Sequence, residues 1–174
     1  MLAANYETGN VAELPIRPDG SLGEATDVKA DKGPPGPTRA KDARPGSFAI
    51  SDHDGPHTHM IQSDPAGRFV FAADLGLDRI CIWKFDAVSG KLSPHNPAYV
   101  SLSPGAGARH FLFHPNGRYF YSLQEEASTI VLFDYDAQNG TLRSGRNFRR
   151  CHKVSQVRAL LPKSGFRETP GLSM

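Results

Sequence analysis

The sequence has only two cysteines and no run of apolar residues long enough to cross a membrane as a helix. Two cysteines are too few for a disulfide framework, and a membrane-spanning helix needs about 18 consecutive apolar residues, so neither class is expected. Net charge is only +2, with Lys and Arg scattered among Asp and Glu, which argues against nucleic acid as a partner. The first residues lack the basic and apolar regions of a signal peptide, which predicts a cytoplasmic location.

Glycine and proline are abundant instead, with 17 and 14 residues in a chain of 174. Such an excess is expected of a chain that turns often. Between these breaks, apolar residues alternate with a period of two, which is typical of β-strands and not of helices. The sequence therefore predicts an all-β fold.

An internal repeat is the most informative feature of the chain. Residues 57–92 and 107–142 align without a gap when the first segment is shifted by fifty positions. The residues that coincide are Pro65 with Pro115, Gly67 with Gly117, Arg68 with Arg118, Ile80 with Ile130, Asp86 with Asp136, Ala87 with Ala137, Gly90 with Gly140 and Leu92 with Leu142. Self-similarity at a fixed period indicates one supersecondary unit used twice, and such units bury their faces by stacking on one another.

Each copy is expected to contain four antiparallel strands separated by turns rich in Pro, Gly, Asn and Asp. In the first copy the predicted strands are His59–Ser63, Arg68–Ala73, Arg79–Phe85 and about Lys91–Leu102. In the second copy they are Arg109–Phe113, Arg118–Leu123, Thr129–Tyr135 and about Thr141–Asn147. Four strands in about 45–50 residues is the period of a propeller blade.

A degenerate third copy precedes these two. Val11 aligns with Ile80 at an offset of 69, and Gly20 aligns with Gly90 at an offset of 70. We therefore predict a partial β-propeller of four-stranded antiparallel blades, with about two full blades plus part of a third. The expected division is blades at about residues 2–30, 57–102 and 107–147, a polar connector at 31–54, and an atypical, poorly ordered tail at 148–174.

The repeat also predicts a site. Subtracting fifty from Arg109 gives position 59, so His59 and Arg109 begin the first strands of consecutive blades. The first strand of every propeller blade lines the central channel, so both side chains are expected to face one pocket. Glu125 lies in the turn after the second strand of its blade, which is close to a rim of that channel.

The residues alone leave other roles open. His57 and His59 form a His-x-His pair that suits a metal, but zinc needs further ligands, and the spacing to His53 and His110 defines none, so no metal is expected. His59 is equally suited to a hydrogen bond between blades, Arg109 to an ion pair, and Glu125 to a solvated turn.

Four groups of residues resemble the seven-bladed lactonase family, which contains propeller-type 6-phosphogluconolactonases and fungal carboxy-muconate cyclases. The resemblance covers about residues 2–147. Its motifs are Pro56-His57-Thr58-His59, Asp64-Pro65-Ala66-Gly67-Arg68-Phe69, Ala73-Asp74-Leu75-Gly76-Leu77-Asp78-Arg79, and Gly105-Ala106-Gly107-Ala108-Arg109-His110 with His114-Pro115-Asn116-Gly117-Arg118. The chain departs from the family at Gln124, where Asn is usual, and at Ala108, where Pro is usual.

The resemblance implies a lactone hydrolase of carbohydrate metabolism, similar to 6-phosphogluconolactonase, that needs no cofactor and no metal. It implies catalytic roles for His59, Arg109 and Glu125, and substrate contacts from His57, Arg109 and His110. The expected substrate is a small anionic lactone or sugar phosphate. Alternatives are a cyclase-like lactonising enzyme, a non-catalytic propeller module that binds a partner, and an inactive chain. Because family members are longer, the ring is not expected to close, which predicts self-association through open blade edges.

Overall fold

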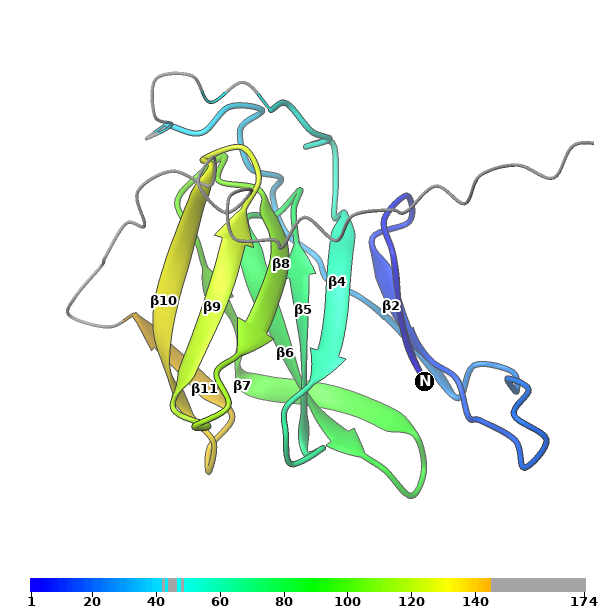
Figure 1. Cartoon of the computed structure of the whole chain (residues 1–174). Helices are drawn as coiled ribbons and strands as arrows, with labels where there is room; N and C mark the ends of the chain where they lie inside the picture. Colours follow the sequence, from blue (N-terminus) through cyan, green and yellow to red (C-terminus); the bar gives the residue numbers. More distant parts are fainter. Residues whose placement is uncertain (42, 44–46, 48, 145–174) are drawn as a thin grey trace, which may run out of the picture.

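The computed structural model describes residues 1–41, 43, 47 and 49–144, and this part of the chain consists of β-strands joined by turns and loops, without a helix (Figure 1). The first sheet contains β1 (Leu2–Asn5), β2 (Asn10–Glu13) and β3 (Asp27–Ala30). The second contains β4 (Thr58–Ser63), β5 (Phe69–Asp74), β6 (Arg79–Asp86) and β7 (Lys91–Ser101). The third contains β8 (Ala108–Phe113), β9 (Tyr119–Gln124), β10 (Thr129–Asp136) and β11 (Thr141–Ser144).

Consecutive strands are antiparallel neighbours within each sheet, and the three sheets stand side by side as blades (Figure 1). β5, the second strand of its blade, contacts β8, the first strand of the next blade, and β1 contacts β4 in the corresponding place. β1 is therefore equivalent to the second strand of a blade. The prediction of an all-β partial propeller is confirmed, and the described sheets do not close into a ring. No helix able to cross a membrane occurs within these described segments.

Four predicted strand starts were wrong by one residue, and β4 and β8 begin one residue earlier than predicted, at Thr58 and Ala108. β5 and β9 begin at Phe69 and Tyr119, and the arginine before each belongs to the preceding turn. The backbone N–H of Arg68 donates to Asp64 Oδ1 (2.7 Å). That of Arg118 donates to the side-chain oxygen of the turn asparagine (3.0 Å). Side-chain acceptors of this kind close a turn and compete with the strand for the backbone donor. The end of the last predicted strand, residues 145–147, and the tail at 148–174 lie outside the described residues.

The second sheet is covered on both faces, because every residue of β5 is buried. Residues facing the first sheet pack in one cluster with Val11, and include Val70, Ala72, Cys81 and Trp83. Residues facing the third sheet pack in a larger cluster that includes Phe69, Phe71, Ile80, Ile82, Phe111, Phe120, Phe133 and Tyr135. Alternate side chains of one strand thus supply two interblade cores, which is the geometry that stacked blades require.

Polar contacts fix the second and third sheets in register. Asp78, at the end of the turn between β5 and β6, accepts hydrogen bonds from the backbone N–H of Gly105 (2.5 Å) and Gly107 (2.8 Å). At the other end of the blades, the hydroxyl of Tyr135 donates to Asp64 Oδ2 (3.0 Å). The loop that leads into β8 is therefore held by the neighbouring blade at a defined place.

The described part of the polar connector, predicted at residues 31–54, is attached to the blades by hydrogen bonds and burial. It runs over the end of the blades where β5 and β9 finish (Figure 1). The N–H of Gly36 donates to the carbonyl of Gly76 (2.8 Å), and His53 is buried.

Candidate active site

His59 and Arg109 occupy equivalent β-bulges. The pairing of β4 with β5 shifts across His59, and the pairing of β8 with β9 shifts across Arg109. A bulge inserts one extra residue and re-aims its side chain, and bulges are common beside active sites. The offset of fifty therefore relates the two residues in backbone geometry as well as in sequence.

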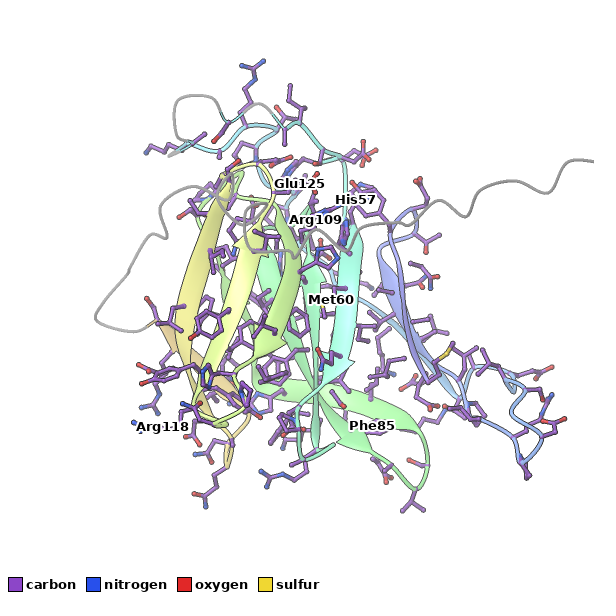
Figure 2. All side chains as sticks on the ribbon, viewed as in Figure 1. His57, Met60, Phe85, Arg109, Arg118 and Glu125 are labelled. Atoms are coloured by element: carbon purple, nitrogen blue, oxygen red, sulfur yellow. The ribbon has the colours of Figure 1, made fainter. Side chains whose placement is uncertain are left out.

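Arg109 and Glu125 are brought together by this arrangement. Arg109 Nε lies 2.9 Å from Glu125 Oε2, and the two side chains are 41% and 30% exposed. Figure 2 shows both at the same end of the blades as His57, with Arg118 and Phe85 at the opposite end. The Nε–H does not point at the carboxylate well enough to form a hydrogen bond, so the contact is an ion pair. The terminal nitrogens of Arg109 form no hydrogen bond with the described residues, which leaves the guanidinium fork for an anionic ligand.

His59 lies beside His110, with ring centroids 4.8 Å apart and the rings at 72°. Burial lowers the pKa of His59 below its ordinary value of 6.5, and the nearby charges of Arg109 and His110 lower it further. Burial and Arg109 also lower the pKa of His110. Both imidazoles are therefore neutral at neutral pH, and a neutral imidazole can accept a proton. His59 Nδ1 is buried and has no hydrogen-bond partner in the part of the chain that is described.

His57 is placed differently from the other predicted residues. Its Nδ1 contacts the carbonyl of Tyr6 (3.0 Å), and its Nε2 contacts Asp54 Oδ1 (2.6 Å). Burial alone would lower the pKa of His57, but the hydrogen bonds to Asp54 and to the Tyr6 carbonyl outweigh it, so the pKa is raised. Because both ring nitrogens are engaged, His57 joins the first two blades and offers no ring nitrogen to a substrate.

Tyr6 was missed by the sequence analysis. Its ring lies 5.8 Å from that of His59, and its hydroxyl donates to Asp52 Oδ2 (3.1 Å). The offset of 69 that aligns Val11 with Ile80 also places Tyr6 at the blade position of Glu125, directly after the second strand. That equivalence is the signal that could have identified Tyr6.

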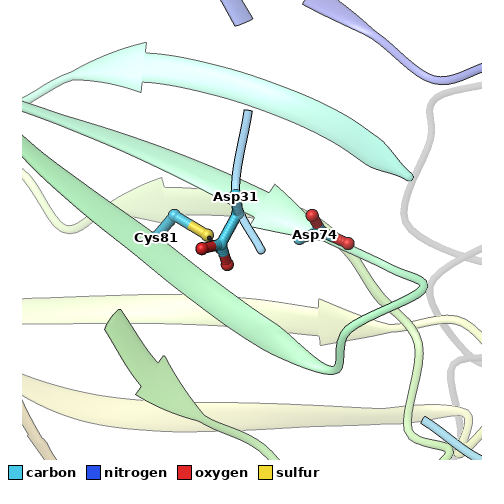
Figure 3. Close-up of side chains that lie close together, drawn as sticks. All are labelled: Asp31, Asp74 and Cys81. Carbon is cyan, nitrogen blue, oxygen red and sulfur yellow. Dashed lines mark hydrogen bonds between the residues drawn. The ribbon is translucent and has the colours of Figure 1, made fainter. Parts of the chain in front are cut away.

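One cluster of metal-ligand side chains occurs in the described residues: Asp31, Asp74 and Cys81, with ligand atoms within 4.8 Å of one another (Figure 3). The Cys81 thiol donates to Asp31 Oδ2 (3.0 Å), and Arg79 Nη1 lies 3.1 Å from the same oxygen. Burial, followed by the charge of Asp31, raises the pKa of Cys81 well above its usual value, which keeps the thiol protonated. A protonated thiol and a guanidinium fit a hydrogen-bonded junction between blades better than a metal centre.

Comparison with known families identifies the class of protein. The family model described as "Lactonase, 7-bladed beta-propeller" matches residues 1–158. The chain therefore belongs to the seven-bladed lactonase family, and the resemblance predicted from its sequence motifs is confirmed.

Several relatives carry the names of lactonases. The chain is 32% identical over 144 residues to the 6-phosphogluconolactonase of Bacillus subtilis (strain 168), covering 82% of this chain and 36% of the relative. It is 32% identical over 142 residues to the 6-phosphogluconolactonase of Pectobacterium carotovorum, again covering 82% and 36%. Among solved structures, the periplasmic gluconolactonase PpgL of Pseudomonas aeruginosa superposes with a TM-score of 0.65 at 28% identity, covering 88% of this chain and 40% of PpgL. A Bacteroides fragilis structure superposes with a TM-score of 0.72 at the same identity and coverage. The chain spans little more than a third of the length of the curated relatives it matches.

Proposed function

We propose that this chain carries the active-site residues of a lactone hydrolase of carbohydrate metabolism, acting on a small anionic sugar lactone such as 6-phosphogluconolactone. The observation that carries the proposal is the Arg109–Glu125 ion pair beside the neutral imidazole of His59. The relatives named as 6-phosphogluconolactonases support the same reaction. A cytoplasmic location and self-association through open blade edges remain predictions.

In this mechanism His59 acts as the general base. It takes a proton from water as the water oxygen attacks the lactone carbonyl carbon, and the resulting imidazolium returns the proton to the ring oxygen as the carbon–oxygen bond breaks. Arg109 stabilises the negative charge that develops on the carbonyl oxygen or clamps the substrate's anionic group. Glu125 holds the guanidinium in place from its Nε side. His110 lies at the edge of the site, where it can contact the substrate.

The first test is hydrolysis of 6-phosphogluconolactone by the chain, compared with the spontaneous rate. His59→Gln removes the base and is expected to lower kcat by about 10²-fold. Arg118→Ala is the control, because this exposed arginine lies in the turn before β9, at the opposite end of the blades (Figure 2). A wild-type rate equal to the spontaneous one, or full activity in His59→Gln, would sink the proposal.

The pH dependence of kcat/KM follows from the lowered pKa of His59. The neutral imidazole is the active form, so the rate is expected to fall as the pH drops through the folded pKa, at a pH below 6.5. His110→Gln removes one neighbour that opposes protonation of His59, and we expect it to move the acid limb toward higher pH. Measuring both proteins with one substrate cancels the ionisation of the substrate itself. No shift, or a shift toward lower pH, would contradict the assignment.

A further inference from the structure

A buried histidine–glutamate pair lies next to the proposed site and has no role in the mechanism above. His53 Nε2 lies 2.8 Å from Glu126 Oε2, with side-chain exposures of 0% and 1%. The other carboxylate oxygen of Glu126 accepts a hydrogen bond from the backbone N–H of Ser51 (2.8 Å). Both oxygens of one buried carboxylate are thus bound by the segment, residues 49–57, that leads into β4.

The pair also connects two neighbouring blades. His53 Nδ1 contacts the carbonyl oxygen of Gly76 (3.2 Å), and Gly76 occupies in the second sheet the turn position that Glu126 occupies in the third. Because a carbonyl oxygen only accepts, Nδ1 must donate. The short contact at Nε2 then needs a second proton, held by the ring or by the carboxyl group. The pair is therefore joined by a hydrogen bond, either from an imidazolium to a carboxylate or from a carboxylic acid to a neutral imidazole.

The pair contacts or belongs to the segments that lead to the three proposed catalytic residues. Glu126 directly follows Glu125, and His53 precedes the strand that carries His59. Gly107, two residues before Arg109, has a φ of 68°, and a Cβ there would lie 3.2 Å from the Glu126 carboxyl group. The backbone N–H of Glu126 also donates to the carbonyl of Ala106 (3.1 Å). One buried contact thus links the turn that carries Glu125 to the segments that precede Arg109 and His59.

We propose that His53 and Glu126 are positioning residues that hold the turn of Glu125, and through it the guanidinium of Arg109, in register with His59. A buried hydrogen-bonded pair is costly to leave half made, so it favours a single arrangement of the backbone around it. The effect on catalysis rests on the function proposed above. The effect on the turn does not, and it can be measured separately.

Amide hydrogen exchange of Glu125, Glu126 and Ala127 tests the proposal without an activity assay. His53→Ala leaves the Glu126 carboxyl group buried without its partner, and we expect exchange of these amides to accelerate by about tenfold or more. Glu126→Ala is expected to do the same. Glu126→Gln is the rescue variant: its amide oxygen can accept from Ser51, and its NH₂ can donate to His53 Nε2, so exchange should stay near the wild-type rate.

His95→Ala is the matched control. His95 is buried and also joins two blades, through Nε2 and the carbonyl of Asn139 (2.7 Å) in the turn between β10 and β11. It is expected to lower stability without accelerating exchange of the Glu125–Ala127 amides relative to the rest of the third sheet. This comparison separates a local effect on the turn from general destabilisation.

In the activity arm, His53→Ala should raise KM for 6-phosphogluconolactone by about tenfold, because a displaced Arg109 binds the anion less well, and Glu126→Gln should keep the wild-type KM. The positioning role of the pair would be overturned if His53→Ala left the amide exchange rates and KM unchanged. It would also be overturned if Glu126→Gln and Glu126→Ala accelerated exchange equally. A wild-type chain without lactone hydrolysis would overturn the proposed function alone, and the exchange comparison would still decide the role of the pair.

Discussion

Replacing Arg109 by alanine is expected to lower kcat/KM for 6-phosphogluconolactone by about 10³-fold. The guanidinium supplies a permanent positive charge near two imidazoles whose pKa values burial lowers. Its removal also leaves Glu125 as an unpaired carboxylate, 30% exposed, where an anionic substrate should bind. The lost attraction and the new repulsion add, so the effect should exceed that of losing one neutral hydrogen-bond donor.

A second substitution separates these two contributions. The double variant Arg109→Ala/Glu125→Gln removes the unpaired carboxylate, and we expect it to regain about tenfold of the lost kcat/KM. Calorimetric binding of the product, 6-phosphogluconate, should show the same order of affinities: wild type, then the double variant, then Arg109→Ala. Arg118→Ala again serves as the charge-matched control. Activity and product affinity that survive in Arg109→Ala would remove Arg109 from the site.

The parts of the fold that repeat were predictable from the sequence. The turns that end at Gly67 and Gly117 have almost the same backbone φ, 66° and 68°, because the same residue types recur at the same offset. The starts of β5 and β9 were predicted one residue too early because a side chain captures the backbone donor there, as Asp64 does with Arg68. The equivalent bulges at His59 and Arg109 followed from the same offset, because the repeat places the two residues at the same blade position.

The parts of the site that do not repeat could not be predicted in this way. His53 lies before the repeat, which begins at residue 57, so no offset placed His53 beside Glu126, which is 73 residues away in the chain. The contacts of His57 were equally unpredictable: its motif belongs to the family pattern, and its two ring nitrogens are engaged by Asp54 and Tyr6. Hydrogen bonds between distant segments depend on how blades dock, and periodicity carries no information about them.

The core between the second and third sheets should be the most sensitive part of the molecule to truncation. Phe71 is fully buried on β5, and its ring centroid lies 5.2 Å from Phe113, 5.7 Å from Phe120 and 5.8 Å from Tyr135, all in the third sheet. Phe71→Ala removes this ring and leaves a cavity between the blades. We expect it to lower the free energy of unfolding by about 3–5 kcal/mol, measured by urea denaturation.

Phe71→Ala should also lower activity at the proposed site, because His59 and Arg109 come from the two sheets that Phe71 holds together. Since a loss of this size can unfold a marginally stable domain, Phe71→Leu provides a milder variant that keeps part of the contact and should lose less. Leu112→Ala is the control: Leu112 lies on β8 but is 54% exposed, so truncation there should change stability by only about 0.5 kcal/mol. Equal effects of Phe71→Ala and Leu112→Ala would mean that the two blades are not joined through this core. The relative placement of β4 and β8, which carry His59 and Arg109, would then depend on the polar contacts at the blade ends instead.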